Sequence, residues 1–412
     1  MAEIRTFPCL RPAPKYAAAI AALPYDVYSR AEARNIVSEN PLSFLKIDRP
    51  ESQCAETIDI YCEEVYGKAT QTLTQMTEDG YFLADPTPCY YVYELSLKGR
   101  SQTGLVGCAA VDDYLNGVIK KHENTRTDKE NDRICHIDVC EAQTGPIFLA
   151  CRQNAQISKI MSDVKRAVPL YDFTAADRVT HRVWRIDDIM MLNEIYFQLS
   201  GISSVYIADG HHRAAAAVKT AANRRAANPD YNGDEEFNYF LSVLFPENEL
   251  HILPYNRVVH DLNGYSESAF LDALSEKFEI KRFSRGSYTP KNRHELGMYL
   301  NKKWYELIPH ESLISTDPIA GLDVSILQDN ILSPVLGIEN PKLDERISFI
   351  GGIRGLGAVE AAVDDQPLAV GFSLFPTTMD ELFSVSDAGK LMPPKSTWFE
   401  PKLRSGLFIH EI

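Results

Sequence analysis

The sequence predicts a mixed α+β protein made of two packed regions. Its 412 residues are 45% hydrophobic and 24% charged, which is the composition of an ordinary globular protein. Helical and β-type segments alternate along the chain, and several β-type runs come in pairs without a simple βαβ repeat. The pattern changes near residue 260. We therefore expect a first region over 1–260 and a second, α/β region over 261–412.

The first region begins with a helix over 30–39. Ser29 and Glu32 form a capping box at its start, and Pro41 follows its end. Two β-type runs flank KGRSQ at 98–102 and predict a hairpin. The other elements expected here are a helix over 55–77, a helix capped by Thr127 and Glu130 and closed by Gly145, a strand over 146–151, two β-type runs between 168 and 186, a helix over 188–201, a strand ending at Ala208, a helix from Arg213 to Ala227, and two strands around a tight turn within 237–259.

The second region is expected to start with a helix over 266–278 and a strand over 279–284. Two further helices are predicted over 292–307 and 320–332. A strand, a glycine turn and a helix are predicted within 348–363, where the glycines are spaced G-x-x-G-x-G. That spacing matches neither the dinucleotide-binding fingerprint nor the phosphate-binding P-loop, so close packing of the turn is an alternative to a ligand role.

Composition and charge exclude several classes of protein. The net charge of −15 repels nucleic-acid backbones, and no basic face offsets it, so we expect no nucleic-acid partner. No apolar stretch follows a basic N-terminus and none is about 20 residues long, so we expect neither a signal peptide nor a membrane span. Eight cysteines without a C-x-x-C pair predict reduced thiols. We expect a cytoplasmic protein. The sequence leaves open whether it forms a homo-oligomer.

The most informative motif is SSVYIADGHHRAAAA at 203–217, where a strand runs into a helix. A metal site is disfavoured because neighbouring histidines on a helix diverge by about 100°. A nucleophile is disfavoured because no G-x-S-x-G motif is present. An anion site fits best, since a helix start offers free backbone N–H groups and an arginine offers a planar fork. The candidate residues are Asp209, Gly210, His211, His212 and Arg213. An aspartate cap with incidental histidines is the alternative.

The segment KKHENTRTDKENDR at 120–133 is the second candidate. It places cations, a histidine and a carboxylate before a helix, where the helix dipole favours anions. His122 and Glu123 offer a general base, whereas Lys120 and Arg126 offer phosphate contacts. We expect this segment to fold against residues 209–213 and complete one pocket. The alternative is a solvated run of charge.

Two further segments carry candidate residues. PPKSTWFEPKLRSG at 393–406 is rich in charge and contains an aromatic anchor, so it predicts either a site-lining loop or an ordered C-terminal strap. LPYD at 23–26 presents Asp26 after a proline and a tyrosine. Asp26 is a candidate magnesium ligand or base.

The motif at 208–217 resembles known phosphate-binding loops. ADGHHRAAAA is similar to the Gly-Cys-His-Arg loop of sulfiredoxin and the Gly-Glu-Arg-Arg box of the ParB nucleotide-binding domain. It resembles the Asp-Gly-His-(Thr/His)-Arg motif of the ParB-like free serine kinases more closely. The whole chain resembles the DUF1015 family, described as SpoOJ/ParB-like, in RPAPKYAAAIAALPYDV, NPLSFLKIDRPE, KKHENTRTDKENDR, GPIFLA, YIADGHHR, LPYNRVV and MPPKSTWFEPKLRSGLFIH.

These resemblances imply a ParB/sulfiredoxin-like nucleotide-binding core, with the second α/β region packed on it and closing the site. Residues 209–213 would contact nucleotide phosphates. The chain departs from the DNA-partitioning relatives because it is acidic and lacks an evident helix-turn-helix, so no DNA role is carried over.

The function expected from the motif and the resemblance is phosphoryl transfer from ATP or ADP, with Mg²⁺, to a small hydroxylated metabolite such as free serine. Arg213 and the loop amides would hold the phosphate, and His211, His212 or Glu123 would take the hydroxyl proton. Two alternatives stay open: a non-catalytic nucleotide-binding regulator and a nucleotide hydrolase.

Overall fold

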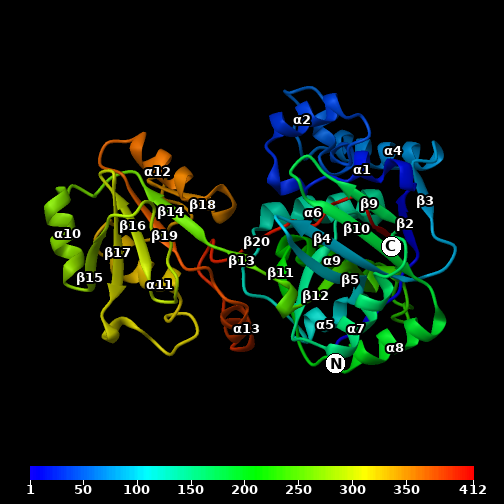
Figure 1. Ribbon diagram of the computed structural model, residues 1–412. Helices are drawn as coiled ribbons and strands as arrows, with labels where there is room; N and C mark the ends of the chain where they lie inside the picture. Colours follow the sequence, from blue (N-terminus) through cyan, green and yellow to red (C-terminus); the bar gives the residue numbers. More distant parts are fainter. The chain divides into compact units, whose positions relative to one another are not determined.

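The computed structural model describes residues 1–412, and they divide into two compact units (Figure 1). Unit 1 contains residues 1–250 and 401–412, and unit 2 contains residues 251–400. The border therefore lies ten residues before the expected one, and the last twelve residues belong to the first unit. They do so because the C-terminal strand pairs with strands of unit 1. The expectation that residues 261–412 close a site stays a prediction.

Unit 1 is organised around a nine-stranded, mostly antiparallel sheet. Only two pairs, β6 with β11 and β8 with β12, are parallel. In spatial order its strands are β6 (Ile119–Lys120), β11 (Val205–Asp209), β8 (Ile147–Cys151), β12 (Tyr239–Pro246), β5 (Arg100–Ala110), β4 (Tyr90–Leu97), β10 (Thr180–Ile186) and β9 (Tyr171–Thr174), with β1 (Ile4–Arg5) paired to β5.

A second sheet of four short strands completes unit 1. Its order is β3 (Phe82–Ala84), β2 (Cys9–Pro12), β21 (Ile409–Glu411) and β7 (Ala142–Gln143). Figure 1 shows the C-terminus beside the N-terminal strand β2, as this pairing requires. The helices of unit 1 are α1 (Ala17–Ile20), α2 (Arg30–Glu39), α3 (Leu45–Asp48), α4 (Glu63–Glu78), α5 (Val111–Leu115), α6 (Thr127–Cys140), α7 (Ala155–Val164), α8 (Ile189–Ser200) and α9 (His211–Ala227).

Helix α9 packs on the main sheet and forms part of the hydrophobic core of unit 1. It packs against β8, β12 and α6. Small residues make this close packing possible, because Ala214, Ala217 and Ala221 are all buried among the apolar side chains of β8 and β11. The alanine run that follows the histidines thus anchors the start of the helix at the edge of a rigid core.

Unit 2 is built on a six-stranded antiparallel sheet. Its order is β15 (Phe278–Phe283), β17 (Lys303–Pro309), β16 (Leu296–Leu300), β19 (Val370–Leu374), β14 (Tyr255–Val259) and β18 (Ile347–Gly351), and a separate pair joins β13 (Ile252–Leu253) to β20 (Trp398–Phe399). Its helices are α10 (Glu267–Ser275), α11 (Asp323–Leu327), α12 (Leu356–Asp364) and α13 (Met379–Asp387). The mixed α+β class predicted from the sequence is confirmed.

The predicted helix over 292–307 is wrong. These residues form the hairpin of β16 and β17, which pair from Leu296↔Leu307 to Leu300↔Lys303. The turn residues Asn301 and Lys302 have φ of 46° and 60°, which is the left-handed pair that a two-residue hairpin turn requires. The spacing of the apolar residues fits both a helix and a strand, and the turn decides in favour of strands.

Three other expectations need correction. The two strands within 237–259 do not form a hairpin, because β12 joins the sheet of unit 1 and β14 that of unit 2. Helix α4 begins at Glu63 rather than Ala55. Helix α6 has no side-chain cap and ends at Cys140, with Glu141 in the left-handed region, rather than at Gly145. The capping box of α2 and the hairpin of β4 and β5 are confirmed.

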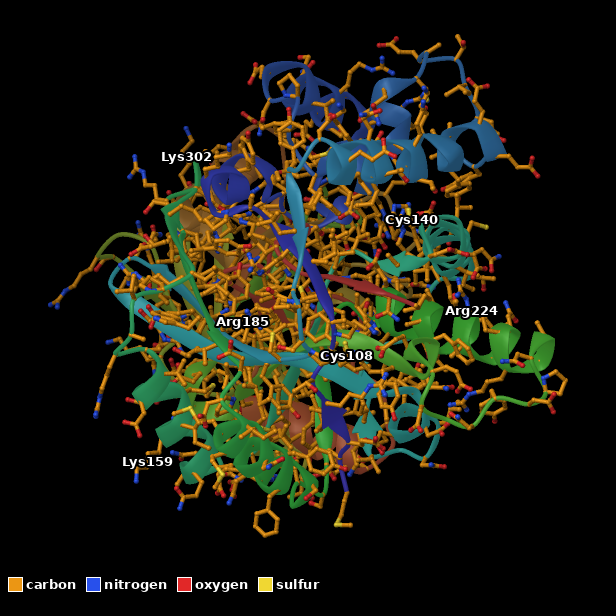
Figure 2. All side chains as sticks on the ribbon, turned by 90° about the vertical axis from the view of Figure 1, so that its right-hand side faces the viewer. Cys108, Cys140, Lys159, Arg185, Arg224 and Lys302 are labelled. Carbon is orange, nitrogen blue, oxygen red and sulfur yellow. The ribbon has the colours of Figure 1, made fainter.

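All eight cysteines are free, and six of them are buried. Figure 2 labels two of the buried ones, Cys108 on β5 and Cys140 at the end of α6. None of the helices combines the length and the apolar character needed to cross a membrane.

Candidate functional site

The loop between β11 and α9 is the centre of the candidate site. Gly210 is the N-cap of α9, and its φ of 90° and ψ of 29° lie in the left-handed region that glycine adopts without strain. No side chain caps this helix, and its first returning backbone bond runs from Ala214 N–H to Gly210 O at 2.9 Å. The backbone N–H groups of residues 211–213 therefore point out of the helix without a side-chain acceptor.

Asp209 is not a helix cap. Its carboxylate pairs with Lys402 Nζ at 3.2 Å and lies 3.8 Å from the Arg213 guanidinium. Burial alone would raise the pKa of Asp209, but the positive charges of Lys402 and Arg213 outweigh burial and lower it to about 2. The carboxylate is thus ionised and occupied by cations. This geometry removes the alternative of an aspartate cap.

The segment at 120–126 folds against this loop, as expected. Strand β6 pairs in parallel with β11, with Ile119 opposite Val205. The His122 ring then lies edge-on to the His211 ring, with centroids 4.5 Å apart and planes at 88°. The backbone N–H of Arg126 donates to His212 Nε2 at 3.0 Å. Two segments about 85 residues apart in the chain therefore form one cluster of three histidines.

Burial keeps these histidines neutral. It lowers the pKa of His122 to about 4, although a hydrogen bond with the Ile207 backbone and the charge of Asp209 oppose the shift. It lowers the pKa of His211 well below the ordinary value, and the neighbouring His122 adds to the effect. It also lowers the pKa of His212, against the charges of Glu123 and Asp26. Near neutral pH the rings act as hydrogen-bonding groups rather than cations.

His211 has one unsatisfied polar atom. Its side chain is 6% exposed, yet Nε2 has no hydrogen-bond partner within the protein. Buried polar atoms are almost always paired with protein, water or ligand. Because this atom lies in the first turn of α9, a ligand or a water at the loop would provide the missing partner.

Arg213 points beneath the loop rather than into open solvent. It donates to the Pro146 carbonyl at 2.7 Å, and a Cβ at Gly210 would come within 3.0 Å of its guanidinium. With Arg133 it lines a small pocket of about 30 Å³, which has room for about two water-sized groups. The lining residues are Tyr25, Asp48, Arg133, Ile137, Gln143, Thr144, Gly145, Ile147, Arg213, Ala217 and Ser405.

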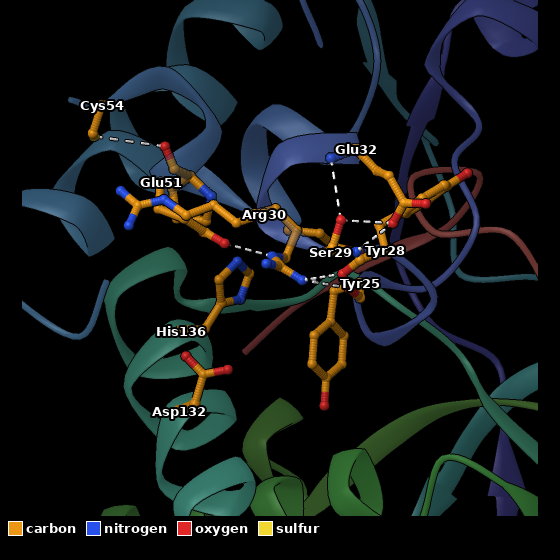
Figure 3. A network of polar contacts seen from close by, with 12 residues as sticks. Tyr25, Tyr28, Ser29, Arg30, Glu32, Glu51, Cys54, Asp132 and His136 are labelled. Carbon is orange, nitrogen blue, oxygen red and sulfur yellow. Dashed lines mark hydrogen bonds and ion pairs between the residues drawn. The ribbon is translucent and has the colours of Figure 1, made fainter. Parts of the chain in front are cut away.

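The wall of this pocket is held by a polar network on α6 and the N-terminal segment. Arg133 is buried, its Cζ lies 3.9 Å from the Tyr25 ring centroid, and it pairs with Asp132 at 2.9 Å. Figure 3 shows Asp132 and His136 projecting from α6 below the Ser29 capping box, with Tyr25 beside them. His136 Nε2 lies 2.8 Å from the Ile47 carbonyl. The arginine is thus fixed in place.

Residues 4–325 match the family described as "Protein of unknown function (DUF1015)", which is well over half of the sequence. The chain belongs to the DUF1015 family. No curated protein matches it.

Eight solved chains are similar to this DUF1015 protein. SbnI with C-terminal truncation from Staphylococcus aureus is 11% identical over 74% of this chain and 87% of that one, with a TM-score of 0.39. Free serine kinase in complex with AMP is 13% identical over 74% and 91%, with a TM-score of 0.35. A conserved hypothetical protein from Pyrococcus furiosus is 12% identical over 74% and 95%, with a TM-score of 0.35. The ParB/sulfiredoxin-like core stays a prediction.

Other predicted site residues lie around the cluster. Lys120 is half-buried, with Nζ 5.8 Å from the Tyr206 ring centroid. Arg126 is exposed and pairs with Asp128 at 2.8 Å, so its side chain is engaged locally. Glu123 and Asp26 act electrostatically on His212. In this DUF1015 protein no group of three or more His, Cys, Asp or Glu side chains is arranged to hold a metal ion. Asp26 as a magnesium ligand stays a prediction.

Several residues of the site were not among the predicted ones. Arg133, Thr144 and Ser405 line the pocket, and Lys402 pairs with Asp209. Lys402 and Ser405 lie in the segment 393–406. Its many charged residues marked it as a candidate, but the sequence did not show that it lies beside residues 209–213. Arg133 ends the predicted segment 120–133, but nothing in the sequence indicates that it turns inward.

Proposed function

We propose that residues 209–213 bind the phosphate groups of ATP or ADP, and that the protein transfers a phosphoryl group to a small hydroxylated metabolite such as free serine. The observation that carries this proposal is the buried, unpaired Nε2 of His211 at the uncapped start of α9. A phosphate oxygen at this point would accept from the ring and from the free backbone N–H groups.

The charges around the loop support an anionic ligand. Helix α9 spans 17 residues, so its N-terminus carries the full partial positive charge of a helix. Arg213 and Lys402 add two cations, and both lie beside the Asp209 carboxylate. A phosphate would therefore be held by neutral and cationic donors together.

Phosphoryl transfer mainly requires positioning and neutralisation of charge. In this proposal the loop N–H groups, His211 and Arg213 hold the transferring group. The candidate acceptors for the hydroxyl proton are His122, His211, His212 and Glu123. Outer phosphate contacts would come from Lys120 and Arg126. His212 Nε2 already accepts from Arg126 N–H, and His211 Nε2 donates to the phosphate in this proposal, which leaves His122 or Glu123 as the better base. No step is assigned to Mg²⁺ itself, and Asp26 is the residue proposed to help hold it.

One observation favours a non-catalytic nucleotide-binding regulator as the second candidate. All three histidines have lowered pKa values, and a neutral ring with a low pKa is a weak general base. A protein that binds nucleotide through such rings without turnover would use them only as hydrogen-bonding groups.

A ligand screen with a turnover assay tests the proposal. The melting temperature of the full chain should rise with ATP or ADP. The rise should be larger than with CTP or GTP, both with and without Mg²⁺. Phosphorus NMR with ATP and serine should then show a new phosphomonoester. Binding without any new phosphorus signal, over a set of hydroxylated acceptors, would favour the regulator; release of inorganic phosphate alone would indicate a hydrolase.

A further inference from the structure

Arg257 of unit 2 is a buried cation without an acidic partner. It lies on β14 and is 3% exposed. Its guanidinium donates to two backbone carbonyls, that of Tyr255 at 2.9 Å and that of Lys395 at 3.4 Å, and it forms no ion pair. Burial without a nearby carboxylate lowers the pKa of Arg257 to about 10. Burying a charge without an opposite charge costs free energy of folding, so a buried unpaired arginine indicates a role beyond packing.

A second cation lies in the same corner. Pairing of β13 with β20 brings Trp398 opposite Leu253 and places residues 395–398 beside the start of β14. The Lys395 ammonium lies 5.5 Å from the Tyr255 ring centroid and forms no ion pair. Lys395 is also exposed and has a φ of 59°. Arg257 thus contacts the Tyr255 backbone carbonyl and Lys395 lies near the ring of the same residue, in a chain whose net charge is −15.

Aromatic rings frame these cations. The Tyr255 ring lies edge-on to Phe349 at 5.9 Å and to Trp398 at 4.9 Å between centroids. The Arg257 guanidinium lies 5.6 Å from the Phe349 ring centroid. A Cβ at Gly351 would meet the Trp398 ring at 3.0 Å, so the end of β18 packs directly on the indole. Glu400 accepts from Trp398 Nε1 at 3.0 Å and so helps to fix the indole.

We propose that Arg257 and Lys395 form an anion-binding site in unit 2, which takes the phosphate or carboxylate group of a small metabolite. The site joins three segments that the loop at 209–213 does not use: the strand with Arg257, the end of β18, and the segment with Lys395 and Trp398. Its ligand supplies the negative charge that Arg257 lacks, and the aromatic rings support the body of the ligand. This proposal is independent of the function proposed for unit 1.

The test uses the full chain carrying Arg213→Ala, which weakens the loop of unit 1. Equilibrium dialysis with inorganic phosphate, and separately with acetate, should find a remaining site. Lys395→Met and Arg257→Met, each added to that background, should weaken the preferred anion at least tenfold. Lys302→Met, which removes another exposed lysine of unit 2, should not change it. The anion that binds more tightly identifies the head group.

Two results would overturn the proposal. The first is a background protein that binds neither anion; the second is unchanged affinity in the Lys395→Met protein. Because Lys395 is exposed, its variant remains informative even if Arg257→Met does not fold. An Arg257→Met protein that folds, gains stability and keeps the anion affinity would also count against the site and make Arg257 a packing residue. ADP binding is also measured in the Lys395→Met protein with Arg213 intact. This measurement tests the loop at 209–213 separately from the site in unit 2.

Discussion

Arg213 combines a structural contact with a position beside the candidate ligand. Its bond to Pro146 and its packing under Gly210 stabilise the loop, while its guanidinium also lines the pocket. Arg213→Ala should therefore weaken nucleotide binding about tenfold or more, since a charge-assisted phosphate contact is worth roughly 1.5 to 3 kcal/mol. Arg213→Lys should restore only part of the affinity. Calorimetric titration with ADP measures both.

The histidines should behave differently from Arg213. His212→Ala should lower turnover more than affinity if that ring acts in the transfer, whereas His211→Ala should also weaken ADP binding, because its Nε2 is proposed to donate to a phosphate oxygen. Lys219→Ala, an exposed change on the same helix, serves as the control and should alter neither quantity. Unchanged ADP affinity in a folded Arg213→Ala protein would contradict the phosphate role of the arginine.

His122 should make the stability of unit 1 depend on pH. Its pKa is lowered to about 4 in the folded state, so its neutral form contributes stability that is fully present above about pH 6.5 and is lost as the pH falls through about 4. The contribution is on the order of 3 kcal/mol. His122→Gln should flatten the pH dependence of the free energy of unfolding within this window.

Urea unfolding followed by Trp184 fluorescence, with the other two tryptophans replaced by phenylalanine, measures this dependence in unit 1. Replacing the exposed His310 by glutamine is the control and should leave the profile of the parent protein. An equally steep profile in His122→Gln would mean that another group titrates.

At the scale of elements, the turn from β11 to α9 depends on Gly210. Gly210→Ala would place a Cβ 3.0 Å from the Arg213 guanidinium and force a non-glycine residue to a φ of 90°. We expect a loss of about 1–2 kcal/mol from the backbone alone and weaker nucleotide binding. Gly67→Ala, on α4 with open space around it, should be neutral or stabilising. Chemical denaturation of both variants gives the comparison, and equal stability would remove the strain argument.

The sequence predicted elements well where local chemistry decides them. The Ser29 and Glu32 pair defined α2, and the runs around KGRSQ defined the hairpin of β4 and β5. It failed at 292–307 because the left-handed turn at Asn301 and Lys302 lacks a glycine. The loop at 209–213 was recognisable because its residues are contiguous. Arg133 and Lys402 were not, because only tertiary packing brings them to it.

At the scale of the whole molecule, the net charge of −15 opposes nucleic-acid binding. We expect no submicromolar affinity for duplex DNA at about 150 mM salt, since long-range repulsion is not offset by a basic face. Fluorescence anisotropy with a labelled duplex of mixed sequence measures this. Tight binding that weakens steeply with salt would reveal a basic surface that the composition conceals.

A crystal structure of the full chain with bound ADP tests the central claim most directly. The account predicts that the phosphates lie at the start of α9, with an oxygen within hydrogen-bonding distance of His211 Nε2 and of the loop N–H groups. A structure in which ADP occupies another place, and residues 209–213 contact no phosphate, would contradict it.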